Sequence, residues 1–450
     1  MLPAALSLEL RKAHPQSVVL VIGAGCSIES PTGLKTAAHY SREAYEELRA
    51  VEAIPEMSDP GDLSALADLV EAETGSKDLL IRRLPLAEFR NAHPNHGYLI
   101  AAALQAEKII RSTLSLNYDL AGVGALRDLR VDTVEQVFAQ DDLSHLGPQL
   151  FAFLHGSART AGVDWVLTAA DLNEEWRSRW QQVIADQALV SPVVVLAGLG
   201  SSAPVVAESI KKIRSALGVS ANYYLADLGS FGSNRFAAEL ELDESAYIQV
   251  AWCAFMEELG SVALRGMIDR AKAAVPTVKA DNAGIDESIA LESVGTNIQD
   301  IGLLGFGRIR SRWTGSSVPY QPSPETPAEQ RMETDLLLAL AQMDASHGPA
   351  VLSVDGRVTL GSGEGLRRVG LFSGGGSMDF EVARLRIQEH GLKGCDIHVV
   401  AHTNAPNLNL PPLDLVEPDE SDDLLRGPAT PLFYLPHLRN GSVAWDELVA

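Results

Sequence analysis

The amino-acid sequence predicts an α/β fold, with a doubly wound parallel sheet and a second, smaller α/β region toward the C-terminus. Short, continuous apolar runs such as residues 18–22 and 193–199 are typical of strands buried on both faces. Segments with helical spacing of apolar residues separate these runs, which is the element order of a parallel sheet. Glycine and small polar residues follow several of the runs, as expected where strands end at a ligand crevice.

The elements of the first region follow from these patterns in order. The apolar runs predict strands at residues 18–22, 108–116, 150–154, 165–168, 193–199 and 223–228. Helical spacing, as in Tyr40, Ala44 and Leu48, predicts helices between them. These helices are expected at residues 6–13, 36–53, 62–73, 78–89, 98–107, 174–188, 204–217 and 246–274.

A proline-rich stretch over residues 314–330 predicts an exposed linker. After it we expect a helix at residues 331–343, strands at 368–372 and 396–401, and a glycine-rich loop at 373–377 followed by a helix. We therefore predict a domain over residues 1–275, a connecting segment with the linker over 276–330, and a C-terminal α/β domain over 331–450.

Composition narrows the classes of function. The 450 residues carry a formal net charge of -23, which argues against direct binding of nucleic acid because such binding needs a basic surface. The three cysteines, Cys26, Cys253 and Cys395, lack metal-ligand spacing, so no metal site is expected. No apolar run approaches the roughly 20 residues that span a bilayer, and the N-terminus does not resemble a secretory signal. We expect a cytoplasmic protein without a membrane anchor.

The first strand runs into Gly23-Ala24-Gly25-Cys26-Ser27. Glycines let the backbone approach a ligand closely, and a helix N-terminus after such a turn attracts a phosphate. This pattern predicts a phosphate site, although a plain strand-to-helix turn uses glycine for geometry alone.

Three further clusters of small or polar residues follow later strands. They are Asn117-Tyr118-Asp119, His155-Gly156 and Gly198 to Ser202. Because the carboxyl ends of parallel strands share one edge of a sheet, we expect the four clusters to converge on one crevice.

The ordered set GAGCS, LNYD and HG resembles the sirtuin-like superfamily, and its NYD form is similar to the bacterial sirtuin-like NAD hydrolases of anti-phage defence. The resemblance covers about residues 10–270 and implies a Rossmann-like, sirtuin-type NAD-binding catalytic domain. It implies that Asn117 positions water and the ribose, that His155 is the general base, and that Asp119 holds the nicotinamide carboxamide. It also implies cofactor-binding residues, with Gly23, Ala24, Gly25 and Ser27 at the pyrophosphate and Gly198, Ser201 and Ser202 at the adenosine end.

Two departures separate this chain from the protein deacylases of that superfamily. The deacylases carry a four-cysteine zinc module, which three scattered cysteines cannot form. Their first motif continues into a GIPDFR-type loop, whereas residues 32–36 read TGLKT here. The resemblance thus implies a hydrolase that converts NAD to nicotinamide and ADP-ribose and depletes NAD in defence. It also implies a homo-oligomer and a trigger protein such as a ring ATPase or a nucleotide-signal sensor.

Alternative interpretations stay open at this point. An NAD-dependent deacylase, an ADP-ribosyl transferase and a non-catalytic module that senses NAD or ADP-ribose all fit a dinucleotide site. His155 could be a turn histidine, and Asn117 and Asp119 could simply end a strand. Cys26 is expected to be a packed small residue, because no base lies near it in the sequence.

Overall fold

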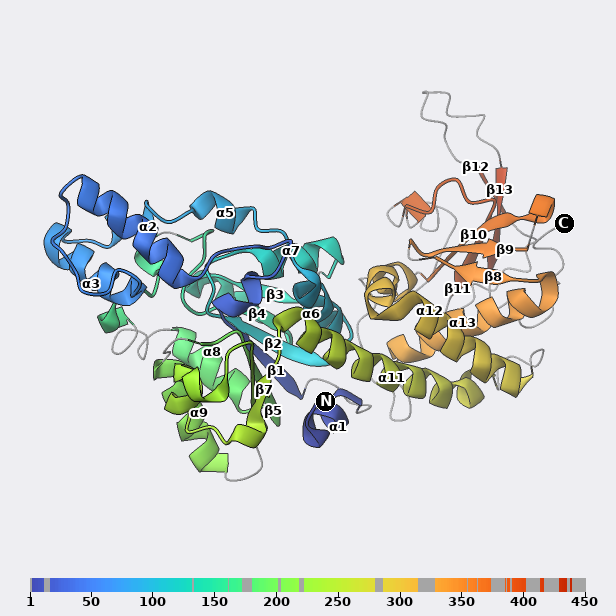
Figure 1. Cartoon of the computed structure of the whole chain (residues 1–450). Helices are drawn as coiled ribbons and strands as arrows, with labels where there is room; N and C mark the ends of the chain where they lie inside the picture. Colours follow the sequence, from blue (N-terminus) through green and yellow to red (C-terminus); the bar gives the residue numbers. More distant parts are fainter. Residues whose placement is uncertain are drawn as a thin grey trace. The chain divides into compact units, whose positions relative to one another are not determined.

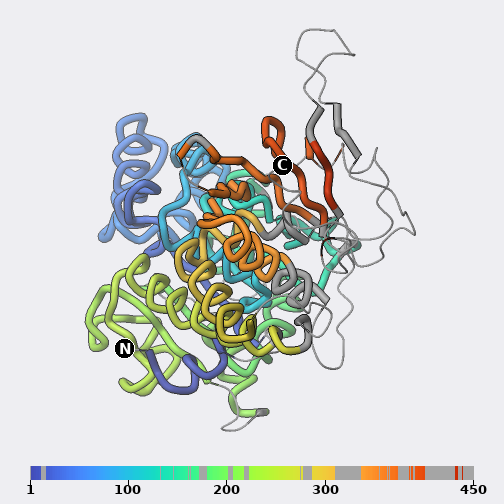
Figure 2. Tube along the Cα trace, turned by 90° about the vertical axis from the view of Figure 1, so that its right-hand side faces the viewer, coloured from blue at the N-terminus to red at the C-terminus, as the bar shows by residue number. Residues whose placement is uncertain are grey.

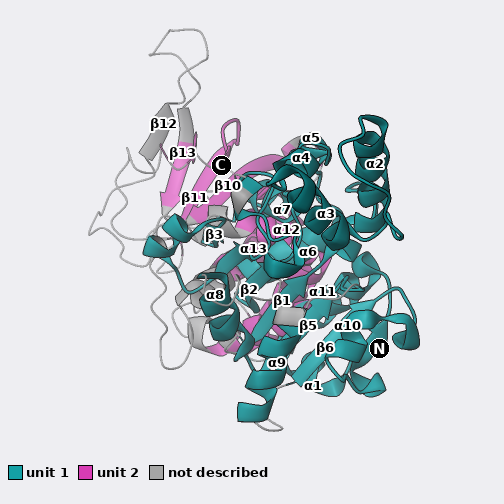
Figure 3. Ribbon diagram, turned by 90° about the vertical axis from the view of Figure 1, so that its left-hand side faces the viewer, with its two compact units in different colours: residues 1–263 teal, residues 264–450 magenta. Residues whose placement is uncertain are grey.

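The computed structural model describes most of the chain. The described residues are 2–11, 17–131, 133–160, 162–171, 180–200, 204–217, 222–279, 286–314, 328–353, 355–361, 363–373, 385, 387–388, 391–401, 413–416, 429–434 and 438. The chain divides into two compact units, residues 1–263 and 264–450 (Figure 3). The predicted boundary at residue 275 stays a prediction.

Unit 1 is built on a seven-stranded sheet in which every neighbouring pair is parallel (Figure 1). Its order is β3-β4-β2-β1-β5-β6-β7. The strands are β1 (Val18–Ile22), β2 (Ile110–Ser115), β3 (Glu135–Val137), β4 (Leu150–Phe153), β5 (Val193–Ala197), β6 (Asn222–Asp227) and β7 (Tyr247–Gln249). The central strands β1 and β5 are buried at every position, which explains their uninterrupted apolar sequences.

Helices cover both faces of this sheet. Side chains from α8 (Trp180–Leu189), α9 (Pro204–Leu217) and α10 (Arg235–Glu239) form one core with Val19, Val21, Val194 and Leu196. On the opposite face Leu20 and Ile22 lie near α6 (His96–Ala106), α7 (Ala121–Asp128) and the first residue of α11 (Trp252–Lys279). The N-terminal helix α1 (Ala4–Arg11) buries Leu6 and Leu10.

The chain between β1 and α6 forms a helical lobe, which we define as α2 (Ala37–Ala50), α3 (Leu63–Thr74), α4 (Asp78–Ile81) and α5 (Leu86–Arg90). Thr36 and Asp62 accept backbone N–H groups at the starts of α2 and α3, and Gly75 ends α3 in the left-handed conformation. The lobe has its own apolar core, to which Trp165 and Leu167 also contribute.

The strand order places a topological switch point between β1 and β5. From β1 the chain builds the sheet in one direction through β2, β3 and β4, and then crosses back to add β5, β6 and β7 on the other side. Loops that follow the strands on either side of such a point diverge and leave a crevice at the carboxyl ends. The glycine loops after β1 and β5 both lie there.

Unit 2 holds a six-stranded mixed sheet in the order β12-β13-β11-β10-β9-β8. Its strands are β8 (Ala350–Leu352), β9 (Arg357–Leu360), β10 (Arg367–Ser373), β11 (Ile397–Ala401), β12 (Leu413–Val416) and β13 (Ala429–Tyr434), of which β10, β11 and β13 pair in parallel. Helices α12 (Glu287–Thr314) and α13 (Ala328–His347) pack against each other and against this sheet (Figure 2). Gly302 interrupts α12 with a φ of 67°.

The structure confirms the predicted α/β class and corrects some elements. Residues 165–168 form no strand, because Trp165 and Leu167 are buried in the core of the helical lobe. The short strands β3 and β7, each three residues long, were not predicted. β7 replaces the first residues of the helix predicted over 246–274, and that helix, α11, begins only at Trp252. The predicted helix over residues 78–89 is two helices, because the chain is not helical over residues 82–85, which end in Pro85. Most of the predicted glycine-rich loop at 373–377 and of the helix after it lies outside the described residues, as do residues 315–327 of the predicted linker. No described helix combines the length and hydropathy that crossing a membrane requires.

Candidate functional site

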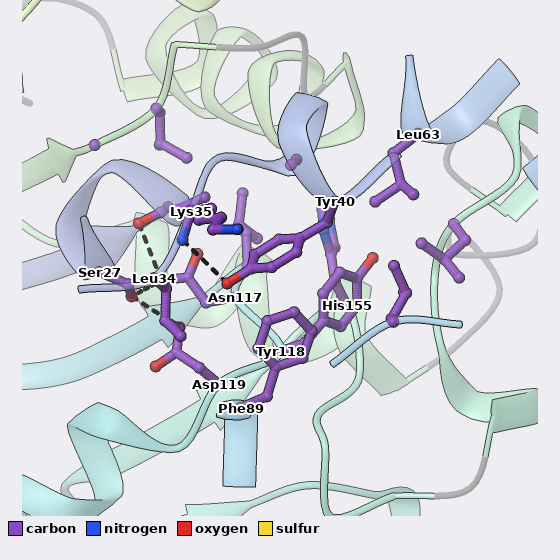
Figure 4. Close-up of a pocket in the computed structure, with 18 of the residues that line it drawn as sticks. Ser27, Leu34, Lys35, Tyr40, Leu63, Phe89, Asn117, Tyr118, Asp119 and His155 are labelled. Carbon is purple, nitrogen blue, oxygen red and sulfur yellow. Dashed lines mark hydrogen bonds between the residues drawn. The ribbon is translucent and has the colours of Figure 1, made fainter. Parts of the chain in front are cut away.

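A pocket of about 240 Å³ opens at the carboxyl ends of β1, β2, β4 and β5 in unit 1 (Figure 4). The loops after these strands supply its polar wall, and the helical lobe supplies most of its apolar wall. The lining residues are Gly23, Ala24, Ser27, Leu34, Lys35, Ala37, Tyr40, Leu63, Ser64, Leu84, Phe89, Leu116, Asn117, Tyr118, Asp119, His155, Val166, Leu167, Gly198, Leu199 and Gly200.

The two glycine loops pack backbone against backbone at the switch point. The Gly25 N–H donates to the Gly198 carbonyl at 3.0 Å, and the Gly23 N–H donates to the Ala197 carbonyl at 2.9 Å. A Cβ on Gly25 would lie 2.7 Å from the Gly198 Cα, and Gly198 has a φ of +64°. These glycines are therefore required by the packing of the loops, and two of their N–H groups are already used within the protein.

A single 3-10 turn, Ala24–Ser27, follows β1, and the next α-helix begins at Ala37. The glycine turn is therefore followed by a 3-10 turn, and the N-terminus of the predicted helix over 36–53 lies further along the chain. Gly23, Ala24 and Ser27 line the pocket, whereas Gly25 supports the loop from behind.

Asn117 follows β2 and is 6% exposed. Its Nδ2 donates to the Gly23 carbonyl at 3.0 Å, and it lies 3.2 and 3.3 Å from the hydroxyl oxygens of Tyr98 and Ser27. A carbonyl can only accept, so this arrangement fixes which end of the amide is the nitrogen. The Oδ1 atom is buried without a hydrogen-bond partner. A buried acceptor left unpaired is unfavourable, so this atom is suited to a donor from a ligand or a water molecule.

Behind Asn117, a chain of hydroxyl groups leads to Asp119. The Ser27 Oγ donates to Asp119 Oδ2 at 2.8 Å and lies 2.7 Å from the Tyr98 hydroxyl. Since the serine has one proton and gives it to the carboxylate, the tyrosine must donate to the serine. Burial raises the pKa of Tyr98 well above its ordinary value, which keeps that donor protonated. The network holds Asn117, Ser27 and Asp119 in one arrangement.

Asp119 is a buried carboxyl at the edge of the pocket. Its Oδ1 accepts the Ala121 N–H at 3.0 Å, at the start of α7. Burial raises the pKa of Asp119, and the hydrogen bonds from Ser27 and the Ala121 backbone oppose that rise. Asp119 thus has a structural role at the start of α7 and also lines the pocket.

His155 follows β4 and lines the same pocket as Asn117 and Asp119 (Figure 4). Its carbonyl accepts the Val166 N–H at 3.0 Å, and the Val166 carbonyl accepts the Tyr118 hydroxyl at 2.8 Å. Burial lowers the pKa of His155 to about 4, although the Asp171 carboxylate acts in the opposite direction. The imidazole is therefore neutral at pH 7 and can accept a proton.

The side of the pocket that faces the helical lobe is apolar. It is lined by Leu34, Tyr40, Leu63, Leu84, Phe89, Val166 and Leu167. The Tyr40 hydroxyl is held by the Lys35 N–H at 3.0 Å and by Glu88 at 3.2 Å. A ligand in this pocket would meet hydrogen-bonding groups at the strand ends and hydrocarbon on the opposite side.

An acidic side chain that the sequence interpretation missed lies at the end of β6. The Asp227 Oδ2 accepts from Asn234 Nδ2 at 3.0 Å and from the Tyr247 hydroxyl at 3.4 Å. A Cβ on Gly200 would lie 3.9 Å from this carboxylate, so Asp227 stands beside the loop after β5. An acidic residue after a strand next to a glycine loop is the signal that could have identified it, because such residues bind ribose hydroxyls in dinucleotide folds.

The pocket brings together Gly23, Ala24, Ser27, Asn117, Asp119, His155 and Gly198 of the predicted site residues. Gly25 lies behind the lining, and Ser201 and Ser202 lie outside the described residues. Tyr98, which interacts with both Ser27 and Asn117, was not predicted, since its position inside an apolar helix suggested only a core residue. Within the described part of the chain, no group of three or more His, Cys, Asp or Glu side chains is placed to hold a metal ion.

Comparisons with known proteins identify similar folds only. No family model matches this chain, and no curated protein matches it. A Sir2 homologue in complex with NAD is 15% identical, with a TM-score of 0.37 over 59% of this chain and 95% of that chain. A mutant Sir2 homologue bound to ADP-ribose is 14% identical, with a TM-score of 0.35 over 59% and 98%. A complex of Sir2 with a p53 peptide and NAD+ is 14% identical, with a TM-score of 0.33 over 58% and 98%.

Proposed function

We propose that this chain is an NAD glycohydrolase, which cleaves NAD to nicotinamide and ADP-ribose. The observation that carries the proposal is the unpaired Oδ1 of Asn117 in a pocket that it shares with His155. One group is a fixed hydrogen-bond acceptor and the other is a neutral base, and hydrolysis of NAD needs both. The ordered strand-end motifs, which resemble those of sirtuin-like NAD hydrolases, agree with this proposal.

In the proposed reaction the bond between the ribose C1′ and the pyridinium nitrogen breaks, and its electron pair leaves on neutral nicotinamide. Positive charge develops on the ribose as in glycoside cleavage, and the oxygen of a water molecule forms the new bond to C1′. The water releases one proton. Because the leaving group becomes neutral by taking the electron pair, no general acid is required to expel it.

Each side chain in the pocket has a role in this proposal. The Oδ1 of Asn117 would accept a hydrogen bond from the attacking water or from a ribose hydroxyl, and His155 would take the proton. Asp119 would hold the carboxamide of the nicotinamide ring. Ser27 and the loop after β1 would contact the pyrophosphate, while Gly198 and Asp227 would lie at the adenosine end.

The test is release of nicotinamide from NAD by the purified full-length chain, without any peptide, across a range of oligomeric states and with candidate activators. We expect His155→Ala and Asn117→Ala each to reduce turnover by at least about 100-fold, because each removes a group that acts in the transition state. The matched control is His39→Ala, which removes an exposed imidazole from outside the pocket and should leave turnover unchanged. Full activity in either pocket variant would contradict the assignment of these residues.

The apolar side of the pocket favours a second candidate, in which the acceptor of ADP-ribose is an acyl group. An acyl chain on lysine would pack against Leu63, Leu84 and Phe89, which a water acceptor does not need. The same assay of nicotinamide release distinguishes the hydrolase from these alternatives. Nicotinamide release that requires an acyl-lysine peptide supports an NAD-dependent deacylase, and release that requires another protein acceptor supports an ADP-ribosyl transferase. Binding of NAD without turnover in every oligomeric state and with every candidate activator supports a sensing module.

We further propose that the enzyme acts as an effector that depletes NAD in anti-phage defence in the cytoplasm. Continuous loss of NAD would kill the host, so such an effector must be silent until triggered. We assign catalysis to residues 1–275 and regulation or oligomerisation to residues 331–450, with a homo-oligomer and a trigger protein as the means of control. Cellular NAD measured during phage infection tests this role, and an unchanged level in cells expressing the active chain would contradict it.

A further inference from the structure

A buried ion pair lies behind the pocket and is not used in the reaction proposed above. The Lys77 Nζ is 2.6 Å from Asp171 Oδ2, and the two side chains are 11% and 6% exposed. The lysine precedes α4 in the helical lobe, and the aspartate is 94 residues further along the chain. Removing two charges from water is unfavourable unless their geometry and remaining hydrogen bonds compensate, so the surroundings of this pair matter.

Both residues of the ion pair make further hydrogen bonds to residues 165–168. The same carboxylate oxygen accepts the N–H groups of Leu167 and Thr168, each at 3.1 Å, and the Thr168 Oγ1 accepts the Asp171 N–H at 3.1 Å. The lysine also donates to the Trp165 carbonyl at 2.6 Å. The ion pair therefore fixes residues 165–168, the segment that forms no strand.

This segment contacts the proposed catalytic loops directly. The Trp165 ring stacks on the Tyr118 ring with centroids 4.2 Å apart, and Tyr118 stands between Asn117 and Asp119. The next residue, Val166, hydrogen-bonds to the Tyr118 hydroxyl and to the His155 carbonyl. A movement of residues 165–168 would thus shift both the loop after β2 and the loop after β4.

The ion pair also determines the charge near His155. The titratable or charged side chains that line the pocket with the imidazole are Lys35, Tyr40, Tyr118 and Asp119. Behind it, the Asp171 carboxylate acts electrostatically on the imidazole, and Lys77 balances that carboxylate. Burial would raise the pKa of Asp171, but the Lys77 ammonium and the two backbone N–H groups hold it below its ordinary value.

We propose that Lys77 and Asp171 are positioning residues for the NAD hydrolase reaction: their buried ion pair holds residues 165–168 against the catalytic loops and neutralises the charge behind His155. This inference rests on the proposed function for its kinetic consequence only. Its structural and electrostatic content concerns the free protein and can be measured without turnover.

The experiment compares single and double substitutions in the full-length chain. Lys77→Met leaves the carboxylate unbalanced, Asp171→Asn leaves the ammonium unbalanced, and the double variant removes both charges. The matched control is Lys211→Met, which breaks an exposed ion pair with Glu241 of the same 2.6 Å length. The first readout is the NMR titration of the His155 imidazole, identified by the loss of its signal in His155→Asn.

We expect Lys77→Met to raise the His155 titration midpoint by about 1 pH unit, because an unbalanced negative charge stabilises the protonated imidazole. Asp171→Asn should lower the midpoint, because an unbalanced positive charge disfavours the protonated imidazole. The double variant should return close to wild type, and Lys211→Met should not change the midpoint. Opposite effects of the two single variants distinguish an electrostatic role from a merely structural one. Equal midpoints in Lys77→Met and wild type would overturn the proposal.

The second readout is the pH profile of nicotinamide release. The acidic limb of kcat/KM should move to higher pH in Lys77→Met, and kcat should fall at least about 10-fold in both single variants, as expected for misplaced catalytic groups. If Lys77→Met does not fold, Asp171→Asn replaces it, with the charge-conserving Lys77→Arg as its control; retention of wild-type kcat in Asp171→Asn would overturn the proposal. A wild-type protein that stays inactive across a range of oligomeric states and with the candidate activators, yet shows the expected NMR shifts, would refute the proposed function and leave the electrostatic role of the ion pair supported.

Discussion

The packing of the two glycine loops leads to a specific prediction for Gly198→Ala. Gly198 has a φ of +64°, and a Cβ built there would lie 2.5 Å from the Cys26 backbone nitrogen and 2.9 Å from its Sγ. The left-handed conformation costs a residue with a Cβ about 1–2 kcal/mol. Relieving the clash requires the backbone of the first loop to move, which costs about 1–3 kcal/mol more by comparison with overpacked cores.

We therefore expect Gly198→Ala to lower the free energy of unfolding of unit 1 by about 2–5 kcal/mol. Gly200→Ala is the matched control, because it lies in the same loop and its Cβ would meet only Asp227 Oδ2 at 3.9 Å. This control should change the free energy of unfolding by less than about 0.5 kcal/mol. Urea denaturation of both variants beside wild type provides the measurement, and equal midpoints for the two alanine variants would refute the packing argument.

Three further predictions concern groups around the pocket. The pKa of His155 in the folded protein, about 4, lies below its ordinary value of 6.5, so its contribution to stability is complete above pH 6.5 and is lost as the pH falls toward 4. Over that interval the free energy of unfolding, measured by chemical denaturation, should fall by about 3 kcal/mol more in wild type than in His155→Gln. Asp227→Ala should weaken binding of NAD about 10-fold in calorimetry and should weaken binding of NADP less, because a carboxylate at this place would contact the ribose 2′-hydroxyl of NAD. Equal weakening of both would exclude a contact between Asp227 and the ribose. Asn95→Ala should destabilise the fold by about 2–4 kcal/mol, since Asn95 caps α6, accepts the Trp252 indole N–H at 3.1 Å and donates to the Cys26 carbonyl at 2.8 Å. Thermal unfolding measures the loss, and an unchanged midpoint would contradict the role of these three hydrogen bonds.

Several features could be predicted from the sequence because their signals are local. The apolar run over residues 18–22 is buried at every position in β1, and the predicted helix over residues 204–217 corresponds to α9. The strand-end clusters were predicted to converge on one crevice because parallel strands share a carboxyl edge, and one pocket is lined by residues from all four clusters. Local pattern and the topology of a parallel sheet were sufficient for these inferences.

Local pattern failed where distant residues decide the outcome. Residues 165–168 have the apolar composition of a strand, but Lys77 and the helical lobe bind this segment outside the sheet. β3 and β7 are too short for a two-residue period to be recognised. The sequence likewise gives no sign that Tyr98, inside an apolar helix, would interact with Ser27 and Asn117.

The sequence by itself determined the α/β class, the positions of most main strands along the chain and the identity of the polar groups at their ends, because burial and turn geometry select residue types position by position. The tertiary structure alone decided how those groups are oriented: the Asn117 amide with its oxygen unpaired, the N–H groups of Gly23 and Gly25 used by the neighbouring loop, and a buried charge pair behind His155. Orientation and local charge depend on contacts between segments about 90 residues apart. Such contacts leave no periodic signal in a single sequence.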